Sequence, residues 1–325
     1  MSALAANTTG ANNIAIGYGA LLVNTTGAQN VAVGANALDA SNADYCTAIG
    51  RSVLGANTTG TQNTAVGSNA MDNNTTGGYN SALGTNALSS NTTGSENVAI
   101  GRQALDDNTT AIRNVAVGNG ALKTNTTGAN NVAIGYVALY SNTTASYNTA
   151  VGDDAMYSNT TGAGNVAYGA YSLYDNTTGH SNTALGSYSP SNGGSNIVAP
   201  LRFNVSGSYN IAIGTGALAS NTTTSGLTAV GYKAMYANTG GTNIAAFGYL
   251  ALQSNTTGFD NTSIGRQTLE DCTTGDRNTA CGSIALTTCT TGSLNAGFGR
   301  EALRDLTTGS YNTGLGRSAG EQMTT

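Results

Sequence analysis

A seventeen-residue repeat constrains this chain more than any other feature of its sequence. An aliphatic residue followed by glycine recurs from Gly17 to Gly186 and from Gly214 to Gly316 at a spacing of 17, with one spacing of 16 and one gap of 28. The consensus is N-x-A-[IVL]-G-x-x-A-L-x-x-N-T-T-G-x-x, nearly unaltered between Asn97 and Asn114. Seventeen residues cannot enclose a core, because fixing each residue's backbone costs about 1–2 kcal/mol. The units must therefore stack on one another as a solenoid.

The consensus predicts a strand–turn–strand unit. N-x-A-[IVL]-G is a short β-compatible segment, A-L supplies a second inward anchor, and N-T-T-G has the residues of a corner turn. Glycines every few residues exclude an amphipathic helix. We expect an all-β fold, a parallel β-solenoid (β-roll) of about 19 coils and roughly 90 Å at 4.8 Å per rung.

The 28-residue gap breaks the repeat. Asn182, Asn196 and Asn210 are spaced 14 and 14, which predicts two shortened coils, and the only prolines, Pro190 and Pro200, fall here. Proline cannot donate to a ladder, so the segment is either a tolerated defect or a bend, a change of width or a presented loop. The expected divisions are solenoid 1–186, an irregular segment 187–209 with 14-residue coils, and solenoid 210–325.

Equivalent positions of stacked coils form columns along the stack. The asparagine that precedes x-A-[IVL]-G is expected to form a hydrogen-bonded amide ladder. Cys46 occupies this column, Cys272 and Cys289 replace the asparagine of N-T-T-G in consecutive coils, and Cys281 replaces an aliphatic residue. These cysteines are either small semi-buried residues or, for Cys272 and Cys289, a disulfide between adjacent rungs. Nothing in their spacing indicates a metal site.

Alanine and the adjacent [IVL] residue of each strand should point to opposite faces of the sheet. Both columns are apolar in nearly every coil, so one can line the interior while the other forms an apolar stripe outside. A stripe of that length marks an association surface. Lateral homo-oligomerisation is predicted, with a trimer as the natural closure.

The segment N-V-A-I-G-R-Q-A-L (Asn97 to Leu105) and its equivalents resemble the head repeats of trimeric autotransporter adhesins, and similar arrays occur in phage tail fibres and other surface fibres. The resemblance covers essentially the whole chain. It implies a left-handed parallel β-roll with three rolls side by side. The extra N-T-T in most coils departs from the usual 14-residue adhesin coil.

Tyrosines and threonine corners are the candidate sites for binding and modification. Tyr140, Tyr157 and Tyr174 share one column, and Tyr136 and Tyr171 lie nearby. They form either an aromatic ladder that stabilises the stack or a receptor and glycan surface. The N-T-T corners are also N-glycosylation acceptors, although turn chemistry alone explains asparagine there. Examples are Asn91, Asn125 and Asn255.

Composition argues against most other functions. Only 8% of residues are charged and the net charge is −5, which excludes a basic nucleic-acid surface. His180 is the only histidine, and the acidic pairs fall at variable positions of different coils. We expect no enzyme activity, cofactor or metal, and no insertion into a membrane.

These features favour a structural and adhesive fibre, extracellular, on a virion or cell surface, that binds a host glycan or protein receptor through repeated weak contacts. The alternatives are a self-assembling extracellular filament without a receptor and, with less support, an ice-binding solenoid. Neither end carries a distinct capping sequence, so we expect a segment of a longer fibre or protomers stacked end to end.

Overall fold

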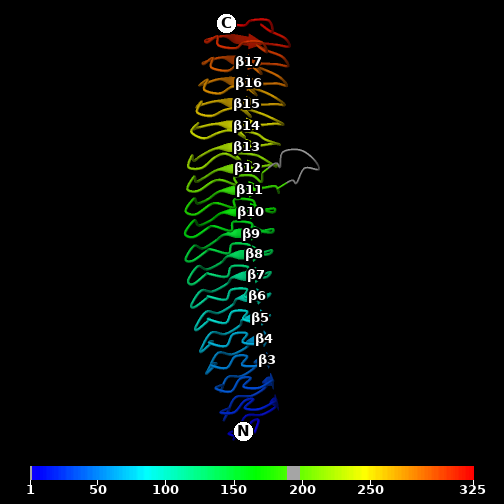
Figure 1. Cartoon of the computed structure of the whole chain (residues 1–325), viewed down its shortest axis with the longest axis vertical. Coiled ribbons are helices and arrows are strands. Elements are labelled where there is room, and N and C mark those ends of the chain that lie inside the picture. Colours follow the sequence, from blue (N-terminus) through cyan, green and yellow to red (C-terminus); the bar gives the residue numbers. More distant parts are fainter. Residues whose placement is uncertain (1, 189–197) are drawn as a thin grey trace. The chain divides into compact units, whose positions relative to one another are not determined.

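The computed structural model describes residues 2–188 and 198–325. They form two units, residues 1–161 and 162–325, and each unit is a parallel β-solenoid. Each strand has three residues, and within each unit it lies beside the strand of the next coil (Figure 1). The described residues contain no helix. The prediction of a parallel all-β solenoid with 17-residue coils is confirmed.

The strands of the first unit are β1 (Ile14–Ile16), β2 (Val31–Val33), β3 (Thr47–Ile49), β4 (Thr64–Val66), β5 (Ser81–Leu83), β6 (Val98–Ile100), β7 (Val115–Val117), β8 (Val132–Ile134) and β9 (Thr149–Val151). Those of the second unit are β10 (Val166–Tyr168), β11 (Thr183–Leu185), β12 (Ile211–Ile213), β13 (Thr228–Val230), β14 (Ala245–Phe247), β15 (Thr262–Ile264), β16 (Thr279–Cys281), β17 (Ala296–Phe298) and β18 (Thr313–Leu315). Within each unit, consecutive strands pair in parallel and alanine pairs with alanine along most of the sheet.

The expected second strand of each unit is absent from the described coils. The A-L step lies in a turn, where Leu105 is fully buried and has a left-handed φ of 52°. That conformation costs an L-residue about 1–2 kcal/mol, and burial of a leucine returns about 1.5–3 kcal/mol. Packing therefore outweighs local preference, and the predicted inward anchor is confirmed although the strand is not.

Glycine is required where each strand ends. Gly101 has a φ of 130°, and a Cβ there would lie 2.4 Å from the carbonyl oxygen of Gly118 in the next coil. An L-residue would meet both backbone strain and a backbone clash at this position. The regular glycine of the repeat thus sets how closely adjacent coils approach.

Two asparagine ladders fill the polar part of the core. In the predicted ladder, Asn97 Nδ2 donates to Asn80 Oδ1 over 3.1 Å and to the carbonyl of Ala111 over 2.9 Å. A second ladder arises from the N-T-T corners, where Asn91 Nδ2 donates to Asn74 Oδ1 over 2.7 Å and to the Gly94 carbonyl over 2.9 Å. Each amide forms hydrogen bonds within its own repeat unit and to the neighbouring repeat unit. The ladders therefore set the register between coils and also stabilise the stack.

The 28-residue segment from Asn182 to Asn210, which we call the enlarged coil, joins two strands that are neighbours in the sheet. β11 pairs directly with β12, and the backbone N–H of Asn210 donates to Asn182 Oδ1 over 3.0 Å. The prediction of two 14-residue coils is therefore wrong, because no rung lies between these two strands. This difference also reduces the expected 19 rungs to 18 strands. Pro190 and Asn196 lie outside the described residues, whereas Pro200 is buried at the alanine position of an A-L step.

Candidate functional site

The outward face of the sheet in each unit carries an apolar column, formed by the third residue of each strand. The central alanine of a strand points inward and is fully buried, as at Ala99, whereas the first and third residues point outward. Many side chains of the third column are exposed by about two-fifths or more, including Ile100 (38%) and Ile134 (40%) in the first unit and Phe247 (40%) in the second. The predicted apolar stripe is confirmed within each unit. Such a surface is unusual for a protein that stays monomeric.

The threonine corners present a narrower polar surface. The first threonine of each corner uses its hydroxyl within the stack, as Thr92 Oγ1 donates to the Thr109 carbonyl over 3.0 Å. The second threonine, for example Thr93, is exposed. In most coils only one corner threonine is exposed, so the corners present mainly a single threonine column, flanked by variable residues such as Glu96.

The tyrosines predicted in the first unit form a partly buried stack. The rings of Tyr140 and Tyr157 are parallel to within 9°, with centroids 5.2 Å apart. The Lys123 ammonium lies 5.7 Å from the centroid of the Tyr140 ring. Tyr136 comes from the column directly after the strand glycine and is 59% exposed. Both interpretations of these tyrosines therefore have a physical basis, since the stack is self-supporting and one face of it remains accessible.

The tyrosines predicted in the second unit belong to a larger cluster. Tyr171 and Tyr174 have centroids 5.6 Å apart, and Tyr188 meets Tyr171 edge-on at 5.6 Å. The Arg202 guanidinium lies over the rings of Tyr171 (4.9 Å) and Tyr174 (5.2 Å). Together with Phe203, these side chains form what we call the Arg202 cluster.

Sequence reasoning missed Tyr188, Arg202 and Phe203 because it aligned the gap on Asn196. The backbone N–H of Leu173 donates to the Pro200 carbonyl over 3.2 Å, so Pro200-Leu201 takes the place of an A-L step. Arg202 therefore occupies the same column as Tyr174. Alignment on this P-L pair was the sequence signal that could have found the cluster.

Cys272 and Cys289 lie in adjacent coils, as predicted, and both are buried free thiols. The hydrogen bond between the two thiols, together with burial, raises the pKa of Cys272. Each Sγ also points at a glycine carbonyl of its own corner, at 3.6 Å for Cys272 and 3.5 Å for Cys289. The thiols thus reproduce the contact of the asparagine they replace, and the structure contains no disulfide between them.

The candidate glycosylation sites lie in the core. Asn91, Asn125 and Asn255 are fully buried. Each side-chain Nδ2, the atom that a glycan would modify, donates to the ladder amide of a neighbouring coil. Modification of the folded chain would require that coil to open, so the structure supports the corner role of these residues.

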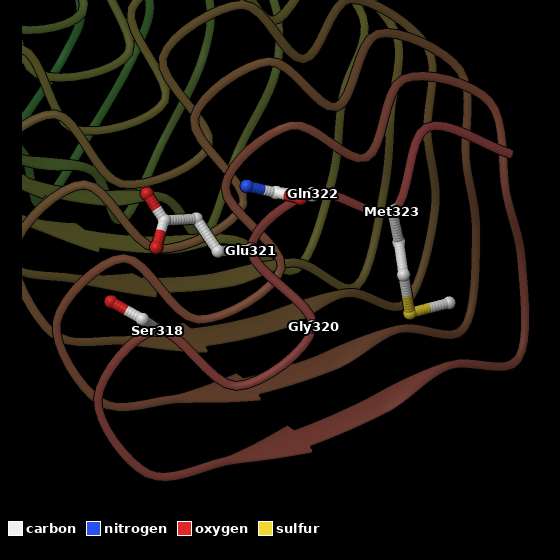
Figure 2. Close-up of a pocket in the computed structure, with 5 residues that line it drawn as sticks. All are labelled: Ser318, Gly320, Glu321, Gln322 and Met323. Carbon is white, nitrogen blue, oxygen red and sulfur yellow. The ribbon is translucent and has the colours of Figure 1, made fainter.

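Two further cavities lack convergent reactive groups. One, of about 500 Å³, lies at Ser318, Gly320, Glu321, Gln322 and Met323, where Figure 2 shows the Glu321 carboxylate and the Met323 thioether pointing in different directions. Its polar groups are already engaged, since Glu321 pairs with Arg304 and Ser318 donates to Glu301.

The other cavity, of about 250 Å³, opens above Gly55 between Asp39 and Asp72. Partial burial raises the pKa of both carboxyl groups. No group of three metal-ligating side chains occurs among residues 2–188 and 198–325. The same residues include no apolar helix of membrane-spanning length.

Comparison with protein-family models and with curated proteins finds no match to this chain. Its function is therefore argued from the two surfaces described above, the outward sheet face and the tyrosine clusters.

Proposed function

We propose that this chain is a structural and adhesive fibre protein, a rigid repetitive rod that presents repeated contacts to a host or surface. The observation that carries the proposal is the exposed apolar column on the outward face of the sheet. The columns behind it are filled by alanine, leucine and amide ladders, so the spacing of the face is regular along each unit. A face of this kind is suited to packing against an identical face.

The partner proposed for the sheet face is a second and a third copy of this chain. Repetition of aliphatic side chains at most rungs would allow three copies to pack side by side in register, and closed symmetry would bury all three faces. The resemblance to adhesin heads supports the same arrangement and a left-handed roll. We propose a location on a virion or cell surface, and no catalytic role.

The adhesive part of the proposal rests on the tyrosine columns. Tyr140 and Tyr157 in the first unit, and Tyr171 and Tyr174 in the second, provide amphipathic rings suited to a sugar face or a protein receptor. Weak contacts repeated over copies and coils would add to a high avidity. Ice binding has less support, because most corners expose only one threonine.

The association is tested by measuring the mass of the native protein in solution by light scattering. We expect three times the chain mass of 32.3 kDa. Ile134→Lys, on the outward face, should dissociate the trimer, whereas the control Thr127→Lys, at an exposed corner, should not. A monomeric wild-type protein, or an Ile134→Lys trimer, would overturn the proposed interface.

Adhesion is tested separately with alanine at Tyr140, Tyr157 and Tyr174. Loss of binding to host cells with an unchanged thermal unfolding curve supports the adhesive role. Electron micrographs of the native particle distinguish a virion-attached fibre from a free filament. Free filaments that bind no cells would contradict the adhesive role.

A further inference from the structure

Side chains of the Arg202 cluster line an open cavity in the second unit. The cavity measures about 430 Å³ and is lined by Tyr171, Tyr188, Val198, Arg202 and Phe203. This volume falls within the range of about 300–1,000 Å³ that is typical of small-molecule sites. Tyr171 and Tyr188 come from two adjacent coils, and Val198, Arg202 and Phe203 come from the far side of the 28-residue segment. The cavity therefore exists because the repeat is interrupted.

Arg202 is the polar centre of this cavity. Its guanidinium lies 4.9 Å from the Tyr171 centroid and 5.7 Å from that of Phe203. Its Nε is buried and has no hydrogen-bond partner. Within the described residues, Arg202 also forms no ion pair within 4.0 Å, in contrast to Arg113, Arg277, Arg300 and Arg304. A buried donor left unpaired costs about 1–3 kcal/mol. The guanidinium charge also lacks an ion-pair partner among these described residues, and an anionic ligand in the cavity would supply one.

The charge near Arg202 also favours an acidic ligand. Arg202 lowers the pKa of the Asp175 carboxyl group, but burial raises that pKa by more. Asp175 does not pair with the guanidinium within salt-bridge distance. The positive charge of Arg202 is thus only partly compensated inside a cavity walled by aromatic rings.

Arginine rather than lysine is the informative residue here. Lys233 makes a comparable contact in a regular coil, with its Nζ 5.3 Å from the Tyr236 centroid and 5.7 Å from that of Tyr232. An ammonium acts as a point charge, whereas a guanidinium presents a planar fork that fits both oxygens of a carboxylate. Aromatic rings beside that fork can stack on the apolar face of a pyranose ring.

We infer that the Arg202 cluster is a binding site for a carboxylated saccharide, with the carboxylate on Arg202 and the sugar ring against Tyr188 or Phe203. This inference rests on the proposed adhesive function and names the ligand class of its second-unit surface. The Arg202 cluster in the enlarged coil would then select the ligand, whereas the regular tyrosine columns would contribute repeated contacts with less selectivity for the ligand.

The test uses the full-length native protein and three probes, which are sialyllactose, a glucuronate-containing disaccharide, and lactose as the neutral control. Titration calorimetry should detect binding of at least one acidic probe and a weaker or undetectable interaction with lactose. Arg202→Met keeps the apolar stem and should weaken acidic-probe binding about tenfold or more. Arg202→Lys should weaken it less, and the matched control Lys233→Met should leave it unchanged.

Circular dichroism melts of each variant verify that the coils remain folded. Equal affinity for acidic and neutral probes, or undiminished binding by a folded Arg202→Met variant, would overturn the inference. Wild-type protein that adheres to cells but binds neither acidic probe would also overturn it while leaving the adhesive proposal intact. Wild-type protein that binds an acidic probe but does not adhere to cells would instead contradict the adhesive proposal alone.

Discussion

The regular coil around β6 and the enlarged coil between β11 and β12 make the same inter-coil contacts with different lengths of chain. Asn97 and Asn114 are 17 residues apart and Asn182 and Asn210 are 28 apart, yet both pairs join an amide oxygen to the next backbone N–H over 3.0 Å. The ladder therefore determines which residues stack, whatever the number of residues between two ladder positions. The cavity that Tyr188 lines lies in the longer of these two coils.

The two coils also differ in the space around the glycine that ends the strand. In the regular coil, Gly101 is crowded by the next coil's backbone, whereas in the enlarged coil a Cβ on Gly186 would lie 3.1 Å from the nearest backbone atom. Both glycines have left-handed φ values, 130° and 140°. The enlarged coil is thus looser at its strand end, which is where the Arg202 cluster assembles.

The largest expected effect comes from substituting these glycines. Gly101→Ala should lower the free energy of unfolding by about 3 kcal/mol or more, because strain and a clash at 2.4 Å add together. Gly186→Ala should cost about 1–2 kcal/mol, mainly strain. Urea unfolding followed by circular dichroism measures both. Equal losses would show that the enlarged coil is packed as tightly as the regular one.

The next effect concerns the second asparagine ladder. Asn91→Ala removes bonds to Asn74 and Gly94, and should cost about 1–3 kcal/mol because buried partners are left unpaired. Asn204 makes equivalent bonds across the enlarged coil, to Asn176 Oδ1 over 2.8 Å and to the Gly207 carbonyl over 2.9 Å. Asn204→Ala should therefore cost the same. A much smaller loss at Asn204 would mean that the ladder is interrupted there.

Much of this fold could be predicted from the sequence because a repeat reports its own periodicity. The spacing of glycine predicted the solenoid, the Asn97 column predicted an amide ladder, and the alternation of Ala99 with Ile100 predicted the outward apolar face. The single strand per coil could not be predicted, because leucine at a left-handed φ contradicts its local preference and is held there by burial.

The candidate site was harder to predict because it lies beside an insertion in the repeat. Tyr171 and Tyr174 were identified from their repeat positions, but repeat positions cannot be assigned across an insertion whose location is unknown. Asn196 happened to bisect the gap, and two equal spacings of 14 imitated a repeat. Only the pairing of β11 with β12 shows that Arg202 follows Tyr174 in its column.

A smaller effect is expected when the enlarged coil is returned to regular length. Deletion of residues 189–199 with Pro200→Ala restores G-x-x-A-L at 17-residue spacing, and alanine avoids the restriction that proline places on the preceding Tyr188. Shortening the loop from 28 to 17 residues should stabilise the protein by about 0.5 kcal/mol. Thermal unfolding measures this change. Loss of the folded state would show that β11 and β12 need the additional residues in order to pair.

The smallest effects distinguish the two regions by the sign of their pH dependence. Burial raises the pKa of Asp175 above its ordinary value of 3.8, so its ionised form destabilises the folded state at neutral pH. Asp175→Asn should therefore be slightly more stable than the wild-type protein at pH 7, and the difference should vanish as the pH falls through the raised pKa.

In a regular coil, the hydrogen bond and charge of Arg113 lower the pKa of Glu96 below 4.5. Glu96→Gln should be slightly less stable at pH 7, and this difference should vanish as the pH falls below 4.5 through the lowered pKa. Melting temperatures of the two variants at pH 7 and pH 3 test both signs. Only the Glu96 difference should shrink in high salt, because that ion pair is exposed to solvent. Stability differences of the same sign would show that Arg202 stabilises the Asp175 carboxylate by more than burial destabilises it.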